Sequence, residues 1–142
     1  MRFVLDASVA FSWLLDDAGA GQVYAVATFD ALTCTDAEAF VPATWSLEIS
    51  NVIAKSEARG ILLPNRSQAF LSALAAAPIE CDGDTHLRAL SGTLALALRY
   101  GLSSYDASYL ELALRRGLPL ASLDKDLMKA AHRAGVKRFP AS

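Results

Sequence analysis

Four carboxylates are the side chains whose type and position in this sequence most clearly suggest chemistry. They are Asp6, Glu48, Asp106 and Asp124, with Asp126 as a possible fifth. Successive members lie 42, 58 and 18 positions apart, so only folding could bring them together. Mg²⁺ and Mn²⁺ prefer hard oxygen ligands and are usually held by a few carboxylates together with waters and substrate phosphate. An ion bound there would relieve the mutual repulsion that otherwise raises carboxyl pKa values, and it could activate a water for phosphodiester hydrolysis.

Each aspartate also has a purely structural explanation. Asp6 and Asp124 stand where a strand gives way to a helix, and Asp is a favoured N-cap residue. Asp106 falls in a first helical turn, where a negative charge meets the positive end of the helix dipole. Taken one at a time, capping is the favoured interpretation. Glu48 differs because it is expected in the middle of a helix, where it caps nothing; a surface glutamate with a packed stem remains the alternative.

The elements that must position these acids alternate between strand and helix. Helices are expected from Ser8 through Leu14, over 22–32, 44–59, 64–76 and 84–100, from Ser103 or Ser104 to Arg116, and over 125–134. Strands are expected over 2–6, 79–81, 119–122 and 136–139. A turn is expected over 16–21. Such alternation predicts an α/β fold with a mostly parallel sheet covered on both faces. Working groups of such sheets lie at the carboxyl ends of the strands. Asp6 and Asp124 end up at that edge, and Asp106 could face it.

Length and composition restrict the class of protein. The 142 residues have a mass of 15.1 kDa, the size of one domain, 1–142. Apolar residues make up 54% and charged residues 20%, which excludes a disordered chain. The apolar stretch 3–15 is broken by Asp6 and too short to span a bilayer, and no signal peptide precedes it. We therefore expect a soluble cytoplasmic protein without a membrane partner, in which Cys34 and Cys81 are small buried residues.

Charge is distributed unevenly along the chain. The formal net charge is −2. Residues 1–98 carry 5 Lys and Arg against 11 Asp and Glu, whereas residues 99–142 carry 8 against 4. The C-terminal third is therefore basic. Charge counting alone leaves two explanations open, a solvated surface and a modest patch that faces phosphate groups.

Other catalytic schemes find little support. His86 and His132 lie on expected helices without an acidic or Cys partner at ligand spacing. The sequence has no GxGxxG, GxxxxGK[ST] or GxSxG motif, which argues against dinucleotide-binding, P-loop and hydrolase-elbow proteins. Asp6 also lacks a second Asp two positions on, so an aspartyl-phosphate mechanism is weakly supported.

Four segments together resemble a known family. They are VLDASVAFSWLL (4–15), PATWSLEISNVI (42–53), LSSYDASYLELALRRGLPLASLDKDL (102–127) and KAAHRAGV (129–136). In this order they are similar to PIN-domain ribonucleases, and most similar to the toxin component of VapBC-type toxin–antitoxin pairs. The resemblance spans essentially the whole chain. It implies a three-layer α/β/α fold with a central parallel sheet and an acidic pocket that binds Mg²⁺ or Mn²⁺.

The resemblance also implies roles for individual residues. The four acids of the family match Asp6, Glu48, Asp106 and Asp124; Asp6 and Asp106 would be the most direct metal ligands, Asp124 would complete the metal site or act through water, and Glu48 would complete the pocket. Ser8 matches a small polar position that supports the first Asp. Ser122 stands where the family often has Thr, and Asp126 recurs in relatives with a role that we leave open.

The implied function is a metal-dependent endoribonuclease toxin, often directed at tRNA or rRNA. Its expected partners are the RNA substrate, a cognate antitoxin that wraps the toxin, and a second copy of the chain in a homodimer. Apolar side chains on 44–59 and 64–76 would suit such contacts, or belong to the core. Candidate RNA contacts are Arg99, Arg115, Arg116 and Lys125, although each could be an ordinary solvated helix charge.

Two alternatives remain at this stage. A non-catalytic RNA- or protein-binding module could share the fold and hold a metal only weakly; the presence of all four acids argues against it. An enzyme acting on DNA ends ranks lower, because the chain has no insertion that would form an arch or a duplex platform.

Overall fold

The computed structural model describes residues 1–15 and 19–141. In chain order the elements are β1 (Arg2–Leu5), α1 (Ala7–Leu15), α2 (Ala20–Leu32), β2 (Glu38–Val41), α3 (Trp45–Ala58), α4 (Pro64–Ala76), β3 (Ile79–Cys81), α5 (Thr85–Arg88), a π-helical segment η1 (Ala89–Thr93), α6 (Leu94–Tyr100), α7 (Ser104–Arg116), β4 (Leu120–Ala121) and α8 (Lys125–Arg133). No helix within the described residues is long and apolar enough to cross a membrane.

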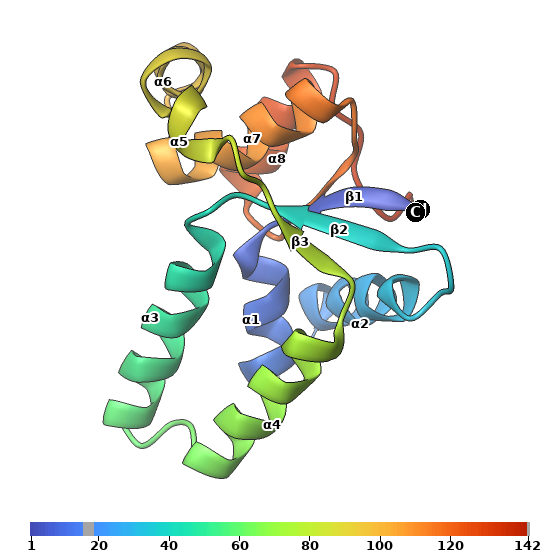
Figure 1. Ribbon diagram of the computed structural model, residues 1–142, viewed down its shortest axis with the longest axis vertical. Coiled ribbons are helices and arrows are strands. Elements are labelled where there is room, and N and C mark those ends of the chain that lie inside the picture. Colours follow the sequence, from blue (N-terminus) through green and yellow to red (C-terminus); the bar gives the residue numbers. More distant parts are fainter. Residues whose placement is uncertain (16–18, 142) are drawn as a thin grey trace.

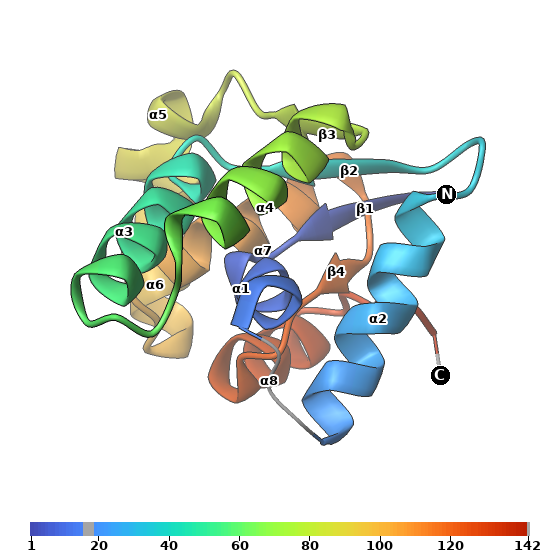
Figure 2. The ribbon, with the colours of Figure 1, turned by 90° about the horizontal axis from the view of Figure 1, so that it is seen from below.

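The sheet is parallel throughout, in the order β3-β2-β1-β4. Figure 1 shows α1 to α4 on one side of this sheet and α5 to α8 on the other, and Figure 2 shows the same layers from below. The fold is therefore the three-layer α/β/α arrangement that the sequence predicts. β1 pairs with β2 on one side and with β4 on the other, so the strand that ends at Asp6 lies inside the sheet.

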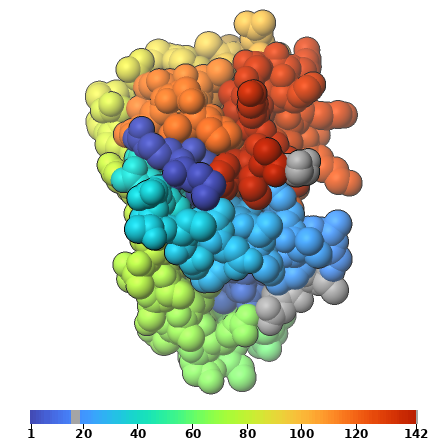
Figure 3. Space-filling model, turned by 90° about the vertical axis from the view of Figure 1, so that its right-hand side faces the viewer, coloured from blue at the N-terminus to red at the C-terminus, as the bar shows by residue number. Residues whose placement is uncertain are grey.

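The buried strands explain why the sequence folds this way. Phe3, Val4 and Leu5 are consecutive and fully buried, as expected for a strand covered by helices on both faces. Each such side chain contributes about 1.5–3 kcal/mol when it leaves water. Phe3 stacks on Phe139 with ring centroids 3.9 Å apart, so the C-terminal segment closes over the first strand. Figure 3 shows this segment, in red, beside the start of β1.

Several sequence expectations differ from the structure in detail. β2 was not predicted, because only three of its four residues are apolar and a polar loop precedes it. The helix expected over 84–100 is divided by η1. The strand expected over 136–139 makes only an isolated bridge between Leu120 and Arg138. The turn expected over 16–21 lies partly outside the described residues, since α2 begins at Ala20.

The expectation that both cysteines are buried was wrong. Cys34 and Cys81 are exposed free thiols. Cys34 lies in the loop before β2, and Cys81 ends β3, an outer strand of the sheet, so neither is covered by a helical layer.

Candidate active site

The carboxyl ends of the two neighbouring strands β1 and β4 bring the first site residues together. Asp6 follows β1 directly and Ser122 follows β4 directly. The amide of Asp6 donates to the carbonyl of Ala121 at 2.9 Å, so the two strand ends are in register. This places residues far apart in sequence at one edge of the sheet, where parallel α/β folds hold their working groups.

Two hydroxyl groups fix the carboxylate of Asp6. Ser8 Oγ and Ser122 Oγ each donate to Asp6 Oδ2 at 2.6 Å. The two hydroxyl oxygens in turn accept the amides of Leu123 and Asp124, both at 3.0 Å. Asp6 is only 4% exposed, and this burial raises the pKa of its carboxyl although the two serine hydrogen bonds lower it. Four hydrogen bonds thus orient one buried acid, and both hydroxyls donate to the same oxygen, Oδ2.

The carboxylate of Glu48, on α3, lies in the same region as that of Asp6. Glu48 lies in the first turn of α3 and not in the middle of the helix as expected, since it is only the fourth residue after the N-cap Thr44. The hydroxyl of the fully buried Tyr109 donates to Glu48 Oε1 at 2.9 Å and accepts the amide of Ala7 at 3.4 Å. Burial raises the pKa of Glu48 to about 7, outweighing the Tyr109 hydrogen bond that lowers it, and the negative charge of Asp6 adds to the increase.

Asp106 enters the same region from the N-terminal end of α7. This helix begins after Ser103, whose Oγ accepts the amide of Asp106 at 3.1 Å, so Ser103 rather than Asp106 is the N-cap. Burial and, to a smaller extent, the charges of Asp124, Asp6 and the exposed Asp126 together raise the pKa of Asp106 to about 6. Asp106 is therefore electrostatically coupled to both strand-end acids.

Asp124 has the capping role that its position predicts. Its Oδ1 accepts the amide of Leu127 at 2.9 Å at the start of α8. The same side chain is one of the charges that raise the pKa values of Asp6 and Asp106. The structural and functional explanations of this residue are therefore compatible, since the cap occupies only one carboxylate oxygen.

Comparison with known proteins identifies the family. The family model described as PIN domain matches residues 3–133, almost the whole chain. The chain belongs to the PIN domain family. It is 28% identical to Ribonuclease VapC3 of Pyrobaculum aerophilum over 142 residues, covering 99% of this chain and 97% of that protein.

Solved structures show the same fold at low identity. The crystal structure of VapBC2 from Rickettsia felis bound to a DNA fragment from their promoter aligns with a TM-score of 0.66 at 11% identity, covering 97% of both chains. That of FitAcB from Neisseria gonorrhoeae aligns with a TM-score of 0.62 at 19% identity, covering 98% of this chain and 96% of that one. At these identities the likeness concerns the fold of the PIN domain.

The donor set of this PIN domain fits a hard divalent cation. Asp6, Asp106 and Asp124 present carboxylate oxygens only, and their coupling raises the pKa values of Asp6 and Asp106. Within residues 1–15 and 19–141, no three His, Cys, Asp or Glu side chains converge tightly enough to enclose an ion by themselves. Mg²⁺ keeps several waters and commonly takes only one or two carboxylates from a protein, so an open arrangement suits it.

The structure separates the four predicted RNA contacts of the PIN domain. Lys125 lines a cavity together with Ser122 and Asp124. Arg99 is exposed on α6, with its guanidinium 5.5 Å from the ring centroid of Tyr100.

The structure places Arg115 and Arg116 at the end of α7 that lies away from Asp106. They lie at the C-terminal end of α7, about 13 Å along the helix from Asp106. Arg115 forms ion pairs with Asp82 at 2.7 Å and Glu111 at 2.8 Å. Arg116 lies 3.8 Å from Asp82 and over the ring of Phe40. Their basic charge is neutralised locally, which a count along the sequence could not reveal.

Sequence reasoning missed Tyr109. Its hydroxyl is the direct contact between α7 and Glu48, yet a tyrosine within an apolar helix segment looks like an ordinary core residue. One signal was available: Tyr109 follows Asp106 by three positions, so the two share a helix face.

Proposed function

We propose that this PIN domain is a Mg²⁺-dependent endoribonuclease that hydrolyses RNA phosphodiester bonds, with Mn²⁺ as a possible substitute. One observation carries the proposal. Burial raises the pKa values of Asp6, Glu48 and Asp106, the charge of Asp6 adds to the increase at the other two, and no Lys or Arg among the described residues forms an ion pair with them. Such a group of acids is costly without a cation and favourable with one.

Asp6, Asp106 and Asp124 are the residues that would hold the ion. When bound, a divalent cation supplies a water of lowered pKa and neutralises charge on the leaving oxygen. The chain itself supplies orientation: Ser8 and Ser122 hold Asp6, and Tyr109 holds Glu48. With its pKa raised to about 7, Glu48 can accept a proton from water near neutral pH, the role of a general base.

A protein partner that inhibits the enzyme is the second part of the proposal. The names of similar proteins support it, since VapC3 is a ribonuclease and a structure from Klebsiella pneumoniae that aligns with a TM-score of 0.57 at 18% identity is named a toxin–antitoxin complex. The chain offers an apolar cavity of about 430 Å³ between α3 and α4, lined by Ile49, Ile53 and Leu71. We therefore propose a toxin restrained by an antitoxin whose apolar segment covers this cavity.

Self-association is proposed on a separate surface. Leu87, Leu90, Leu94 and Leu98 follow one another at helical spacing along α5, η1 and α6, and all four are exposed. Apolar rows of this kind usually mark protein contacts. We propose a homodimer that buries this row, and a cytoplasmic location, where RNA and an antitoxin would both be present.

The decisive experiment is an RNA-cleavage assay on the partner-free protein. Total tRNA and rRNA are incubated with Mg²⁺, with Mn²⁺ or with EDTA, beside the Asp6→Asn variant. Asp30→Asn is the matched control, because Asp30 is an exposed aspartate on α2. Cleavage should require the metal, disappear in Asp6→Asn and persist in Asp30→Asn.

Two outcomes would contradict the proposal. Cleavage that survives EDTA or the Asp6→Asn change would place the chemistry elsewhere. RNA bound by folded, partner-free protein but left uncut under every metal condition would favour the alternative, a non-catalytic RNA-binding module.

A further inference from the structure

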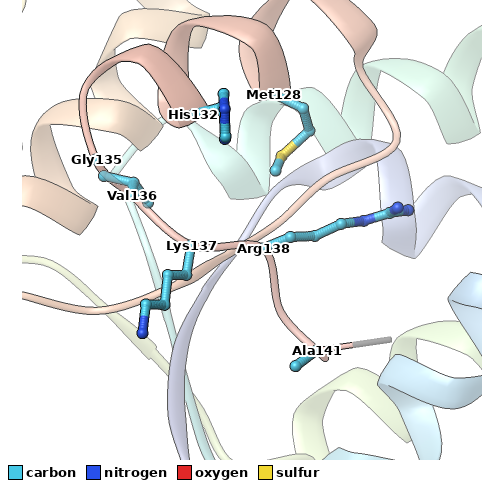
Figure 4. Close-up of a pocket in the computed structure, with 7 residues that line it drawn as sticks. All are labelled: Met128, His132, Gly135, Val136, Lys137, Arg138 and Ala141. Atoms are coloured by element: carbon cyan, nitrogen blue, oxygen red, sulfur yellow. The ribbon is translucent and has the colours of Figure 1, made fainter.

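Two cavities meet beside α8. One, of about 460 Å³, extends from Ser122 and Asp124 past Lys125 to Met128 and Arg138. The other, of about 630 Å³, is also lined by Met128 and Arg138 and reaches His132 (Figure 4). Because they share two lining residues, the cavities adjoin each other, and together they are called the α8 groove. It begins at an acid of the candidate active site and leads away from it.

The wall of the α8 groove is one face of the helix. Lys125, Met128 and His132 are separated by three and four positions, which places them on the same side of α8. Seven residues of α-helix span about 10 Å. A stacked nucleic-acid strand carries one charge per roughly 3.4 Å, so this length matches about three nucleotides.

Arg138 forms the opposite wall. Its guanidinium lies 4.0 Å from the ring centroid of Tyr24 on α2. Stacking of this kind occupies the face of the guanidinium, whereas its hydrogen bonds are made in the plane and suit phosphate oxygens. In Figure 4 the side chain of Arg138 extends past Met128, while that of its neighbour Lys137 points to the other side of the segment.

No ion pair between described residues neutralises the two cations of the α8 groove. The ion pairs found between described residues involve Arg2, Arg115 and Arg116, and none of them includes Lys125 or Arg138. Arg115 and Arg116 are thus paired with carboxylates. Lys125 and Arg138 instead line a groove that opens at Asp124.

We propose that the α8 groove binds the sugar–phosphate backbone of single-stranded RNA next to the bond that is cut, with Lys125 and Arg138 each contacting a phosphate. The inference rests on the proposed function, because RNA bound in the groove would lead to the bond that is cut only if the acids at one end are the active site. A phosphate backbone fits better than an acidic peptide, because the groove has Lys125 on one wall and Arg138 on the other and opens at Asp124, where a phosphate can continue onto a metal held by the acids.

Binding, measured without cleavage, tests the groove separately from catalysis. A fluorescent single-stranded RNA of about ten nucleotides is titrated in EDTA, by anisotropy, at several salt concentrations. Arg138→Ala and Lys125→Ala should each weaken binding about five- to tenfold and lower the salt slope by about one. Arg138→Lys should keep most of the slope, because it retains the charge. Arg59→Ala is the matched control: Arg59 is an exposed arginine at the end of α3, and its removal should change neither quantity.

The outcomes separate the two proposals. Wild-type affinity and salt slope in both Arg138→Ala and Lys125→Ala would overturn the groove, whether or not the protein cuts RNA. Loss of binding in these variants, with wild-type protein that never cuts, would support the groove and reject the nuclease. If the variants instead lose affinity only for a polyglutamate peptide, the groove binds acidic protein and the proposal is wrong. Thermal unfolding of each variant checks the fold, and the exposed Lys125 keeps the test valid if Arg138→Ala does not fold.

Discussion

The two ends of helix α7 hold acids in opposite electrostatic states. At the N-terminal end, Asp106 lies with Asp6 and Glu48, and burial together with like charges raises the pKa values of all three. At the C-terminal end, burial alone would raise the pKa of Asp82, but hydrogen bonds from Arg115 and Thr85 lower it overall. Arg115 has a raised pKa for the same reason, since it donates to Asp82 and Glu111.

This difference between the two ends of α7 distinguishes a structural buried acid from the acids of the candidate active site. Asp82 is 3% exposed and its charge is balanced by an arginine, so the cluster ties the end of β3 to α7 and needs nothing more. The acids at the other end are held in place by hydroxyls, which orient a carboxylate without cancelling its charge. A buried acid that is oriented but not neutralised indicates a candidate functional site.

The largest expected effect is the loss of RNA cleavage when an acid at the N-terminal end of α7 is changed. Asp106→Asn should lower RNA cleavage by more than about 100-fold, because changes even to groups that only support metal ligands cost about 10–100-fold. The same change should not destabilise the metal-free protein at neutral pH, since it removes one of three repelling acids. Cleavage kinetics and thermal unfolding in EDTA check both statements. A variant that cuts normally would remove Asp106 from the site.

The next largest effect is on stability at the C-terminal end. Arg115→Ala should destabilise the fold by about 3 kcal/mol, because it leaves Asp82 buried without its cation. Denaturant unfolding measures this, with Arg99→Ala as the control, because Arg99 is exposed and forms no ion pair with a described residue. Metal-dependent cleavage by the folded fraction should be unchanged. Unchanged stability would show that this cluster is not the structural counterpart of the acidic site.

The stability gained on metal binding should also differ between variants at the two ends of α7. Mg²⁺ or Mn²⁺ at about 100 times its dissociation constant should stabilise the wild type by about 2.7 kcal/mol. Arg115→Ala should gain the same increment, and Asp6→Asn should gain little. Thermal unfolding with and without the ion measures the increments. Equal gains in all three proteins would place the ion outside the candidate active site.

The two ends should also respond to pH with opposite signs. Glu48 and Asp106 have raised pKa values, about 7 and about 6, so their contribution to stability is present below their ordinary values and is lost as the pH rises toward 7. The pKa of Asp82 is lowered, so its contribution is present above its ordinary value and is lost as the pH falls through the lowered one. In EDTA, Glu48→Gln should therefore stabilise the protein near pH 8 relative to the wild type and change it little near pH 4. Parallel pH profiles of the two proteins would contradict this.

The smallest expected effect comes from one hydroxyl. Tyr109→Phe removes the hydrogen bond to Glu48, at a cost of about 1 kcal/mol. Because that bond favours the charged carboxylate, its loss should move the acidic limb of the pH–cleavage profile to higher pH. Tyr24→Phe is the control, since its hydroxyl donates to the carbonyl of Phe139 in the C-terminal segment. A purely structural role for Tyr109 would lower stability and leave the profile in place.

Local patterns predicted much of this fold because they depend on neighbouring residues. The boundaries of α4 and α7 follow from Pro64, Ser103 and a glycine at position 117 that adopts φ +65°, a conformation open to glycine at little cost. β2 escaped prediction because four residues carry too little periodic signal, and its pairing with β1 and β3 is what makes it a strand. The exposure of Cys81 likewise depends on which strand is outermost.

The sequence by itself determined the inventory of acids, the alternation of strands and helices, and the strand ends that carry Asp6 and Ser122. Only the tertiary structure decided which charges meet. Arg115 and Lys125 are both basic residues near the same helices in sequence, yet Arg115 is bound by Asp82 and Lys125 lines the groove beside Asp124. The reason is physical: Coulomb energies and desolvation depend on distances and burial in space, and residues 33 positions apart acquire those only when the sheet and its helices have packed.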